Sequence, residues 1–376
     1  MADTPLSTLV FLLVISAACS SDPLGCTNGC DTESDPLQPP QQRVTALAAG
    51  FSSSCALTQV EMLYCWGENR FGELGDGTRT PRLAPIRVTT MLRFVSVAGT
   101  HGTSRICATT RASLAYCWGY NINGELGDGT QEDQYLPSPV YGGIEFRSLS
   151  TSYHTCGVAT SGRAFCWGPD GSGELGRGTV GGGSVLPAPV VGDLRFTSIG
   201  NGLQFSCGLT IMARAYCWGR GDMLGDGSEQ SRAVPSPVGG NHLFIELSIG
   251  EEHACGVKQD GSLYCWGKAD VWYNPPVLQP RRVIDVPPFT RIAAGDYHTC
   301  ALTRDGAPWC WPSGQTPRPL ATSIRFAGLA SGQNYTCGYT PGGAAYCWSI
   351  QFSFPFLGDG TSRSDTLPVR VDPFPT

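Results

Sequence analysis

The sequence predicts an all-β chain built from seven copies of one unit, and two observations carry this prediction. The phrase aromatic-Cys-Trp occurs seven times, at spacings of 37 to 52 residues. A second cysteine lies ten positions before the cysteine of each phrase. Self-similarity at such a period is typical of an array of one supersecondary unit. The seven pairs are Cys55 with Cys65, Cys107 with Cys117, Cys156 with Cys166, Cys207 with Cys217, Cys255 with Cys265, Cys300 with Cys310 and Cys337 with Cys347.

Each unit contains a β-hairpin, which the fifth copy shows most clearly. Two β-prone runs flank residues 259–261, and Gly261 suits the left-handed position of a three-residue hairpin loop. With that loop, residues whose numbers sum to 520 face each other, so Cys255 lies opposite Cys265. Opposed side chains are about 4.5–5.5 Å apart at Cβ, and a disulfide needs about 3.5–4.5 Å, so a small local adjustment joins them. We therefore expect one disulfide in every unit.

Alternation along the Cys-Trp strand sorts its side chains onto two apolar faces. Tyr264 and Trp266 point to one side of the sheet, and Leu263 and Cys265 point to the other. Because both faces are apolar, both require burial, and small sheets stacked in a ring provide it. A unit of roughly 50 residues has room for four strands, the third being the Cys-Trp strand. The fourth is expected near a Pro-x-Pro-Val signal such as 137–140, and the whole array is predicted to be a seven-bladed β-propeller.

The two ends of the array suggest how the ring closes. The first blade opens at 44–50, and the last copy ends with a fourth-strand signal at 367–371, with little chain after it. We expect the ring to close by pairing strands from the two termini, because closure removes exposed sheet edges.

At this point the residues carry a family resemblance. The strand Gly-x-x-His-x-Cys-x-Leu, seen at Gly295, His298, Cys300 and Leu302, resembles the regulator of chromosome condensation repeat, and so does the Trp-Gly of the first five copies. So does the loop Gly-Glu-Leu-Gly-Asp-Gly-Thr at 72–78. The loop recurs at 124–130, at 173–179 with Arg177 for Asp, and in part at 224–227 and 357–361. The resemblance covers residues 44–376 and implies the propeller fold. The additional pair of cysteines in each blade departs from the usual pattern of the family.

Composition fits one large propeller and argues against nucleic acid as a partner. Charged residues make up 15% of the 376-residue chain, the net charge is −6, and there are 49 Gly and 28 Pro. Such a turn-rich, weakly charged composition is typical of an all-β chain. Nucleic-acid binding would call for a basic balance.

Residues 1–19 are predicted to be an export signal. An apolar run at 9–18 is too short for a stable membrane span and precedes Cys19. The small residues before Cys19 resemble a bacterial lipoprotein cleavage site, where this cysteine would carry lipid. Ser16 and Asp3 depart from that pattern, and no Lys or Arg precedes the apolar run. We expect a lipoprotein, with a plainly cleaved signal, or neither, as the alternatives.

The cysteine count supports export independently. Of the 17 cysteines, fourteen fall into the seven pairs, Cys26 and Cys30 form one more expected pair, and Cys19 is left over. Paired cysteines in every repeat indicate an oxidising compartment, so we expect a protein of the cell envelope or a secreted one. Residues 20–43, rich in Ser, Asp, Pro and Gln, are predicted to be a linker to the propeller at 44–376.

The recurring polar residues are interpreted as structural. His154, His253 and His298 each stand two residues before the first cysteine of a repeat, as expected of a packing or hydrogen-bonding position. His101 and His242 are isolated, and no converging partner for acid–base chemistry is visible. The Gly-Asp-Gly-Thr loops carry one carboxylate each, too few for calcium, and are read as turns. We therefore expect no catalytic residue, no metal and no cofactor.

Copies five and six lack the common loop. After Gly267 it is replaced by 268–276, and after Trp311 by the short segment 312–317. Trp272 and Tyr273 lie outside the core pattern, and such aromatic residues are favoured as binding anchors. We predict a partner contact at Trp272 and Tyr273, the alternative being that Trp272 folds back to cover a blade.

These observations predict an exported protein-binding scaffold that uses propeller rim loops, without catalysis, as a monomer. Its membrane contact is expected only through the N-terminal lipid. The resemblance implies two alternatives: guanine-nucleotide exchange on a small GTPase, the activity of the family's namesake, and inhibition of an enzyme, as by the secreted β-lactamase-inhibiting propellers. An enzyme with carboxylates in the propeller channel is a further alternative, although the repeats place no paired acids there consistently.

Overall fold

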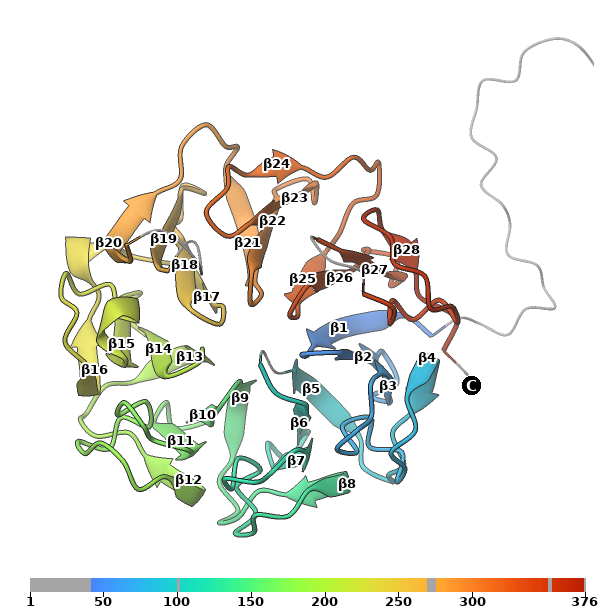
Figure 1. Cartoon of the computed structure of the whole chain (residues 1–376), viewed down its shortest axis with the longest axis horizontal. Helices are drawn as coiled ribbons and strands as arrows, with labels where there is room; N and C mark the ends of the chain where they lie inside the picture. The colour runs from blue at the N-terminus through green and yellow to red at the C-terminus, as the bar shows by residue number, and fades with distance from the viewer. Residues whose placement is uncertain (1–41, 100–101, 269–274, 351–353, 375–376) are drawn as a thin grey trace, which may run out of the picture. The chain divides into compact units, whose positions relative to one another are not determined.

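Seven four-stranded antiparallel sheets make up the part of the chain that the computed structural model describes, residues 42–99, 102–268, 275–350 and 354–374 (Figure 1). Each sheet is one blade formed by four consecutive strands, and the first strand of each blade lies innermost. Residues 40–376 form one unit. The described residues contain two 3-10 helices, η1 (Gly221–Met223) and η2 (Gly239–Asn241), and no helix long and apolar enough to cross a bilayer.

The strands of the first four blades follow one another without interruption. Their bounds are β1 (Val44–Ala49), β2 (Ser53–Thr58), β3 (Leu63–Gly67), β4 (Arg82–Arg87), β5 (Phe94–Gly99), β6 (Arg105–Thr110), β7 (Ala115–Gly119), β8 (Gln134–Pro139), β9 (Phe146–Thr151), β10 (Thr155–Ala159), β11 (Ala164–Gly168), β12 (Ser184–Pro189), β13 (Phe196–Asn201), β14 (Phe205–Thr210), β15 (Ala215–Gly219) and β16 (Arg232–Pro237).

The last three blades have the same order, with shorter outer strands in blades six and seven. Their bounds are β17 (Glu246–Ile249), β18 (His253–Val257), β19 (Leu263–Gly267), β20 (Val277–Arg282), β21 (Phe289–Ala294), β22 (His298–Thr303), β23 (Pro308–Pro312), β24 (Arg318–Pro319), β25 (Gly328–Ser331), β26 (Tyr335–Tyr339), β27 (Ala345–Ser349) and β28 (Val369–Arg370).

The hairpin register is the one that the sequence predicts. In blade five, His253 pairs with Gly267 and Cys255 with Cys265, and Gly261 at the turn has a φ of 81°. The seven cysteine pairs form seven disulfides, each between directly opposed residues with Cα atoms 4.0 to 4.1 Å apart. This separation is that of a non-hydrogen-bonded pair, in which opposed side chains come closest. Cys19, Cys26 and Cys30 lie outside the described residues.

Neighbouring blades pack an aromatic face against a cystine face. Trp266 of blade five is 1% exposed and packs with Cys207 and Cys217 of blade four. On the other face of the same blade, Cys255 packs with Trp311 of blade six. Burial of large apolar side chains stabilises by about 1.5–3 kcal/mol each, so these seven interfaces hold most of the core.

A phenylalanine that precedes or opens the first strand completes six of these interfaces. Its ring lies 5.4 to 6.4 Å from the indole of the Cys-Trp strand in its own blade, measured between centroids. These residues are Phe94, Phe146, Phe196, Phe244, Phe289 and Phe326, and all are buried. Sequence reasoning did not single them out, although their recurrence one to three residues after a Leu, Ile or Val was visible.

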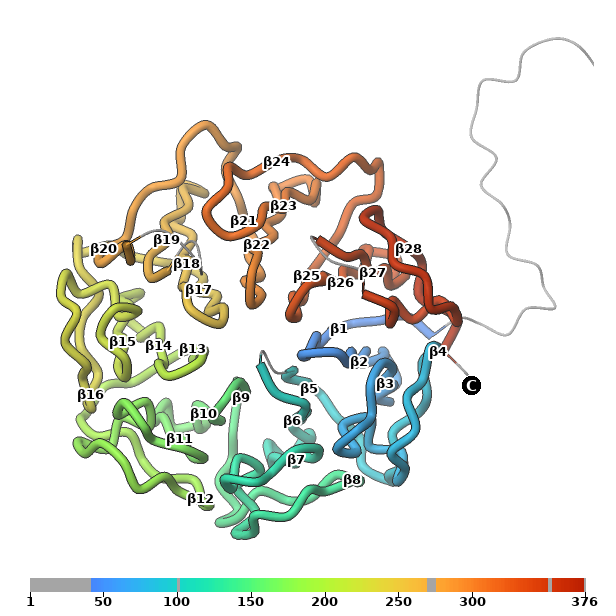
Figure 2. Tube along the Cα trace, in the orientation of Figure 1, coloured from blue at the N-terminus to red at the C-terminus, as the bar shows by residue number. Residues whose placement is uncertain are grey.

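The ring does not close by pairing strands from the two termini, as the sequence analysis expected. Strand β1 pairs with β2 of its own blade, and the last blade is completed by its own β28. The blue first blade instead packs face to face against the red last blade (Figure 2). Phe374, just after β28, contacts Tyr64 and Trp66, so apolar burial closes the ring and no strand has to cross between blades.

Candidate functional site

The Gly-Glu-Leu-Gly-Asp-Gly-Thr loop is a self-contained turn that hydrogen-bonds mainly to itself. In blade one, Asp76 Oδ1 accepts hydrogen bonds from the amide and hydroxyl of Thr78, at 2.9 and 2.7 Å. Asn69 Oδ1 accepts the amide proton of Leu74 at 3.0 Å, and Arg82 pairs with Asp76 at 3.0 Å. These bonds lower the pKa of Asp76 although burial, the largest single influence, raises it. The carboxylate is therefore engaged as a turn cap, and the described residues contain no cluster of three or more metal-ligating side chains.

The loop fills the outer space between its own blade and the next one. Leu74 is fully buried in the cluster that joins the cystine of blade one to Trp118 of blade two. Trp118 Nε1 donates a hydrogen bond to the carbonyl oxygen of Glu73 at 3.0 Å. Gly75 has a φ of 67°, and a Cβ there would lie 2.7 Å from the indole nitrogen, so only glycine fits. Equivalent buried leucines stand in four further blades, at Leu126, Leu175, Leu224 and Leu357.

Blade five has no such leucine, and a cavity lies where the leucine would be. The cavity measures about 280 Å³ and lies between blades five and six. Its floor is apolar, with Cys265, Trp266 and Trp311 from the two Cys-Trp strands. The remaining lining residues are His253, Cys255, Val277, Arg281, Arg282, Val283, Ile284, Thr299, Ser313, Gly314, Gln315, Thr316 and Pro317.

The rim of this cavity is polar and positively charged. Arg281 and Arg282, at the end of β20, are exposed, as are Gln315 and Thr316 from the segment between β23 and β24. The cavity thus combines an apolar floor with convergent polar donors at its mouth, which is the usual composition of a binding site. An apolar side chain that enters it would contact Trp311, and a neighbouring carboxylate would meet two guanidinium groups.

The described structure does not test the partner contacts that the sequence predicts. Trp272 and Tyr273, the predicted partner contacts, lie outside the described residues, between Lys268 and residue 275. The cavity itself was not predicted, although its signal was in the sequence. That signal is the leucine of the common loop, which follows the Cys-Trp phrase in blades one to four and seven and is missing after Trp266 and Trp311.

The three repeated histidines join neighbouring blades. His154 Nε2 lies 2.6 Å from Ser206 Oγ, and because that hydroxyl donates to the carbonyl of Glu174 at 3.0 Å, the histidine is the donor. His253 and His298 make the same contact with threonine hydroxyls, at 2.8 Å each. Burial, reinforced by the charge of Arg105, lowers the pKa of His154 to about 3. His154 is therefore neutral at ordinary pH and acts as a hydrogen-bonding element, as its position in the repeat predicts.

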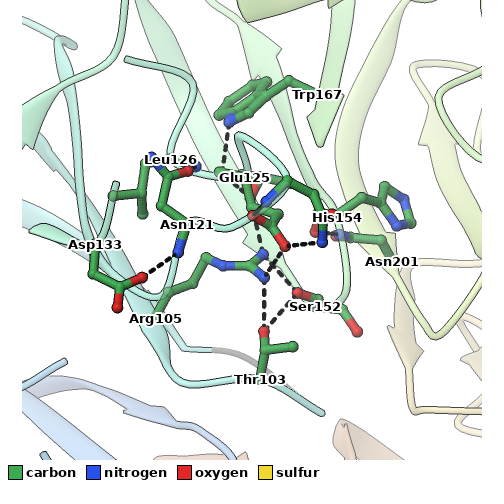
Figure 3. Close-up of polar contacts among 12 residues, drawn as sticks. Thr103, Arg105, Asn121, Glu125, Leu126, Asp133, Ser152, His154, Trp167 and Asn201 are labelled. Carbon is green, nitrogen blue, oxygen red and sulfur yellow. Dashed lines mark hydrogen bonds and ion pairs between the residues drawn. The ribbon is translucent and has the colours of Figure 1, made fainter. Parts of the chain in front are cut away.

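Arg105 occupies the histidine position in blade two and forms a buried ion pair. Figure 3 shows its guanidinium between Glu125, Ser152 and Thr103. Nη2 lies 3.5 Å from Glu125 Oε1, and both side chains are at most 1% exposed. Nη1 donates to the carbonyl of Ser152 at 2.7 Å, and Nη2 donates to Thr103 Oγ1 at 2.8 Å. The ion pair lies within blade two, and the hydrogen bond to Ser152 joins Arg105 to blade three.

The central channel of the ring is lined by small and aliphatic side chains. The described residues around its cavity are alanines, serines, a glycine, valine, leucines and an isoleucine from the innermost strands, such as Ala98, Ser150 and Ala293. Near one mouth, Tyr153 donates a hydrogen bond to Glu251 at 2.8 Å. Burial and the charge of Glu251 raise the pKa of Tyr297 to about 12. Paired carboxylates of the kind expected for the channel-enzyme alternative are not among the described lining residues.

His242 is the remaining histidine that the structure describes, since His101 lies outside the described residues. Its ring packs at a tilt against Tyr264, with centroids 4.3 Å apart, and burial together with Lys258 lowers the pKa of His242. Both neighbours belong to the hairpin of blade five, so His242 packs on the outside of a blade.

These features define the class of the molecule: a seven-bladed β-propeller with one cystine per blade and, among its described residues, a cavity between blades five and six. Two family models, both described as "Regulator of chromosome condensation (RCC1) repeat", match this chain. One matches residues 44–73, 244–270 and 289–311, and the other matches residues 62–104. The chain therefore carries this repeat at the matched positions, which lie in blades one, two, five and six.

Relatives of known sequence share parts of the propeller. The ultraviolet-B receptor UVR8 of Arabidopsis thaliana is 27% identical to this chain over 129 residues. The aligned part covers 34% of this chain and 29% of the receptor. The human E3 ubiquitin-protein ligase HERC2 is 35% identical over 101 residues, which cover 26% of this chain and 2% of the ligase. This chain therefore matches less than a third of the length of these relatives.

Solved structures share the whole ring. Human WBSCR16 superposes with a TM-score of 0.74 at 19% identity, covering 84% of this chain and 94% of that one. Prp20p of Saccharomyces cerevisiae superposes with a TM-score of 0.71 at 18% identity, covering 88% and 87%. At this level of identity the likeness establishes the fold.

Proposed function

We propose that the chain is an exported protein-binding scaffold whose partner inserts an apolar side chain into the cavity between blades five and six. The cavity carries the proposal, because the loop leucine is missing where the described structure has its apolar floor of Trp266, Trp311 and Cys265. An acidic residue beside that side chain would pair with Arg281 and Arg282 at the rim. Variable loops on a rigid ring are suited to recognition, and no covalent step is needed.

The fold supports binding as the general activity. The solved yeast relative, Prp20p, is described with binding properties toward Gsp1p and histones. The seven disulfides favour an oxidising compartment, which supports export to the envelope or the medium and the proposed lipid at Cys19. Nucleotide exchange on a cytosolic GTPase fits poorly with seven disulfides and is not proposed. Inhibition of an exported enzyme is one form that partner binding can take.

Selection from a peptide library tests the cavity. The oxidised full chain is immobilised, peptides are enriched from a displayed library, and the affinity of an enriched peptide is measured by calorimetry. We expect enriched peptides to combine an aromatic or aliphatic residue with an acidic neighbour. Thr316→Trp, which fills the cavity mouth, should weaken binding at least tenfold, because the anchor side chain loses its buried contacts.

The matched control places the same aromatic residue on blade two, whose loop leucine Leu126 fills the interface with blade three. Leu136 is 45% exposed on β8 of blade two, so Leu136→Trp adds an indole without blocking the cavity and should leave the affinity unchanged. The double variant Arg281→Gln, Arg282→Gln should weaken only peptides with an acidic residue. Equal affinity for parent and Thr316→Trp, or no enrichment at all, would refute the cavity as the site.

A further inference from the structure

The hairpin turns of all seven blades lie on one face of the ring, together with the starts of the first strands. In each blade interface, the amide that opens a blade donates a hydrogen bond to a carbonyl in the hairpin of the preceding blade. Examples are Phe94 to Glu61 at 3.2 Å and Phe196 to Gly162 at 2.9 Å, and Val44 to Gly343 at 2.9 Å closes the ring in the same way. We call this the hairpin face. The Gly-Asp-Gly-Thr loops start at the opposite ends of the same antiparallel strands.

The hairpin face is basic although the chain as a whole is acidic. Its hairpin turns and the starts of its first strands carry eleven basic and five acidic side chains, and the connections that lead into these strands add two acidic ones, Asp193 and Asp285. The chain as a whole has a net charge of −6. The basic residues are Arg43, Arg93, Arg111, Arg147, Arg163, Arg195, Arg214, Lys258, Arg291, Arg304 and Arg325, and the acidic residues are Glu61, Glu145, Glu246, Asp260 and Asp305. Positive charge is therefore concentrated on one side of a chain whose overall composition is acidic.

Several arginines on this face are held in fixed positions around the ring. Arg93, Arg195 and Arg325 each precede a buried phenylalanine that packs against the tryptophan of the same blade. Because that phenylalanine is anchored, the preceding arginine has to point outward, and all three are exposed. Blades two, four and seven thus expose an arginine at the same position of the repeat.

An exposed apolar knuckle stands among these charges at blades four and five. Ile211 and Met212 form the tip of the blade-four hairpin and are 64% and 71% exposed, and Leu243 and Ile245 beside them are 52% and 47% exposed. The two segments are neighbours, because the amide of Phe244 donates to the carbonyl of Ala213 at 2.8 Å. We call residues 211, 212, 243 and 245 the apolar knuckle.

Basic side chains surround the apolar knuckle. The amide of Ile211 donates to the carbonyl of Arg195 at 3.1 Å, and Arg214 Nη1 donates to Asn241 Oδ1 at 3.2 Å. Lys258 lies over Tyr264 of the adjacent hairpin. A convex apolar tip within a ring of cations has the two parts of an interfacial membrane contact: apolar side chains for the acyl boundary and cations for anionic headgroups.

We propose that the hairpin face docks on an anionic lipid bilayer, with the apolar knuckle inserted at the headgroup boundary. Two observations favour a bilayer over an acidic protein. The charge is spread over all seven blades, which suits an extended flat surface, and the apolar residues protrude at turn tips. In addition, Arg43 binds the carbonyls of Pro341 and Gly342, so the chain enters β1 from this same face. The proposal is independent of the cavity between blades five and six.

Vesicle sedimentation tests this docking with the oxidised chain from residue 20 onward, so that neither the predicted signal at 1–19 nor a lipid is attached. The probes are vesicles of phosphatidylcholine alone and vesicles with about one third phosphatidylglycerol. We expect binding to the anionic vesicles that falls as salt is raised. Arg195→Gln, Arg214→Gln should weaken it about 25-fold, from roughly fivefold for each basic residue at an anionic surface. Ile211→Ser, Met212→Ser should weaken it at least tenfold.

Matched variants on the opposite face keep the test specific. Two double variants change exposed residues on the loop side and should leave binding unchanged: Arg70→Gln with Arg363→Gln, and Ile122→Ser with Val180→Ser. No binding of the parent to anionic vesicles, or equal losses in both sets of variants, would overturn the proposal. Binding to soluble polyglutamate without binding to vesicles would also overturn it, and would assign the face to an acidic protein.

Discussion

One residue position governs how each blade is joined to the next. Two residues before the first cysteine stands a histidine in three blades, an arginine in blade two and a tyrosine in blade seven, and each faces a hydroxyl of the following blade. Ser53 and Phe205 occupy this position in blades one and four. There the following blade offers Ile106 or Ala254 in place of the hydroxyl, so both members of the contact change together.

His154 should make the stability of the propeller depend on pH. Its folded pKa is about 3 and its ordinary value is 6.5, so between these values the unfolded chain binds the proton and the folded chain does not. Stability is therefore complete above pH 6.5 and falls as pH is lowered towards 3, by about 1.4 kcal/mol for each pH unit. In urea unfolding between pH 4 and 6, His154→Gln should flatten this dependence more than His242→Gln does, because His154 is fully buried and His242 only partly so. An unchanged slope in His154→Gln would contradict the assignment.

The common loop of blade three replaces the Asn–Asp pair of blades one and two with an Asp–Arg ion pair. Blades one and two have Asn69 with Asp76 and the equivalent Asn121 with Asp128, whereas blade three pairs Asp170 with Arg177 at 2.8 Å. The Asp170 side chain is fully buried. The sequence shows Arg177 as an exception to the loop pattern. Its partner Asp170, seven residues earlier, is identified only by the folded structure of the turn.

This exchange yields a double-mutant prediction. Arg177→Ala leaves a buried carboxylate without its cation and should destabilise the fold by about 1–3 kcal/mol, the cost of an unpaired buried group. Asp170→Asn with Arg177→Asp restores the arrangement of blades one and two and should recover most of that loss. Measured free energies of unfolding of the two variants test this prediction. A double variant no more stable than Arg177→Ala would show that the two pairs are not interchangeable.

At the scale of elements, the hairpin was predictable and the filling of the gaps was not. The hairpin depends on local turn chemistry and on alternation, so Gly261 and the spacing of Cys255 and Cys265 were sufficient to give its register. The loop leucine acts on the next blade, 40 or more residues away, as Leu74 does on Trp118. A contact of that kind is set by tertiary packing, so the cavity of blade five appeared only in three dimensions.

The missing leucines predict the order in which the disulfides are reduced. Cys265 and Cys310, in the two blades without the loop, are partly exposed, whereas the other twelve bonded cysteines are buried. With a limiting phosphine reductant and alkylation, peptide mass spectrometry should find the pairs of blades five and six reduced first. The pair Cys156–Cys166 serves as the buried comparison, and its earlier reduction would show that the missing leucines do not control access.

At the scale of the whole molecule, one tyrosine joins the last blade to the first. Tyr335 is fully buried, its hydroxyl donates to the carbonyl of Ser53 at 2.7 Å, and it accepts from Ser54 at 2.8 Å. The sequence analysis expected the termini to meet and was wrong about how, because a contact between faces leaves no signal in strand patterns.

Tyr335→Phe should therefore weaken ring closure. Removal of the hydroxyl leaves buried polar groups of blade one without this partner, so the free energy of unfolding should fall by about 1–3 kcal/mol. Tyr216→Phe, at a partly exposed tyrosine of blade four, should change it by less than about 0.5 kcal/mol. Chemical denaturation compares the two, and equal effects would mean that the closing contact carries no special weight.

Because no strand is shared between the first and last blades, each blade is encoded by one uninterrupted stretch of the chain. The boundary between termini is then equivalent to the six other boundaries, down to the hydrogen bond from Val44 to Gly343. A gene for such a ring can be opened at any connection between blades and rejoined at the old ends without dividing a sheet. Whole blades are the natural units of its duplication and loss, and the two blades that lack the common loop can diverge as a pair while the other five keep the ring intact.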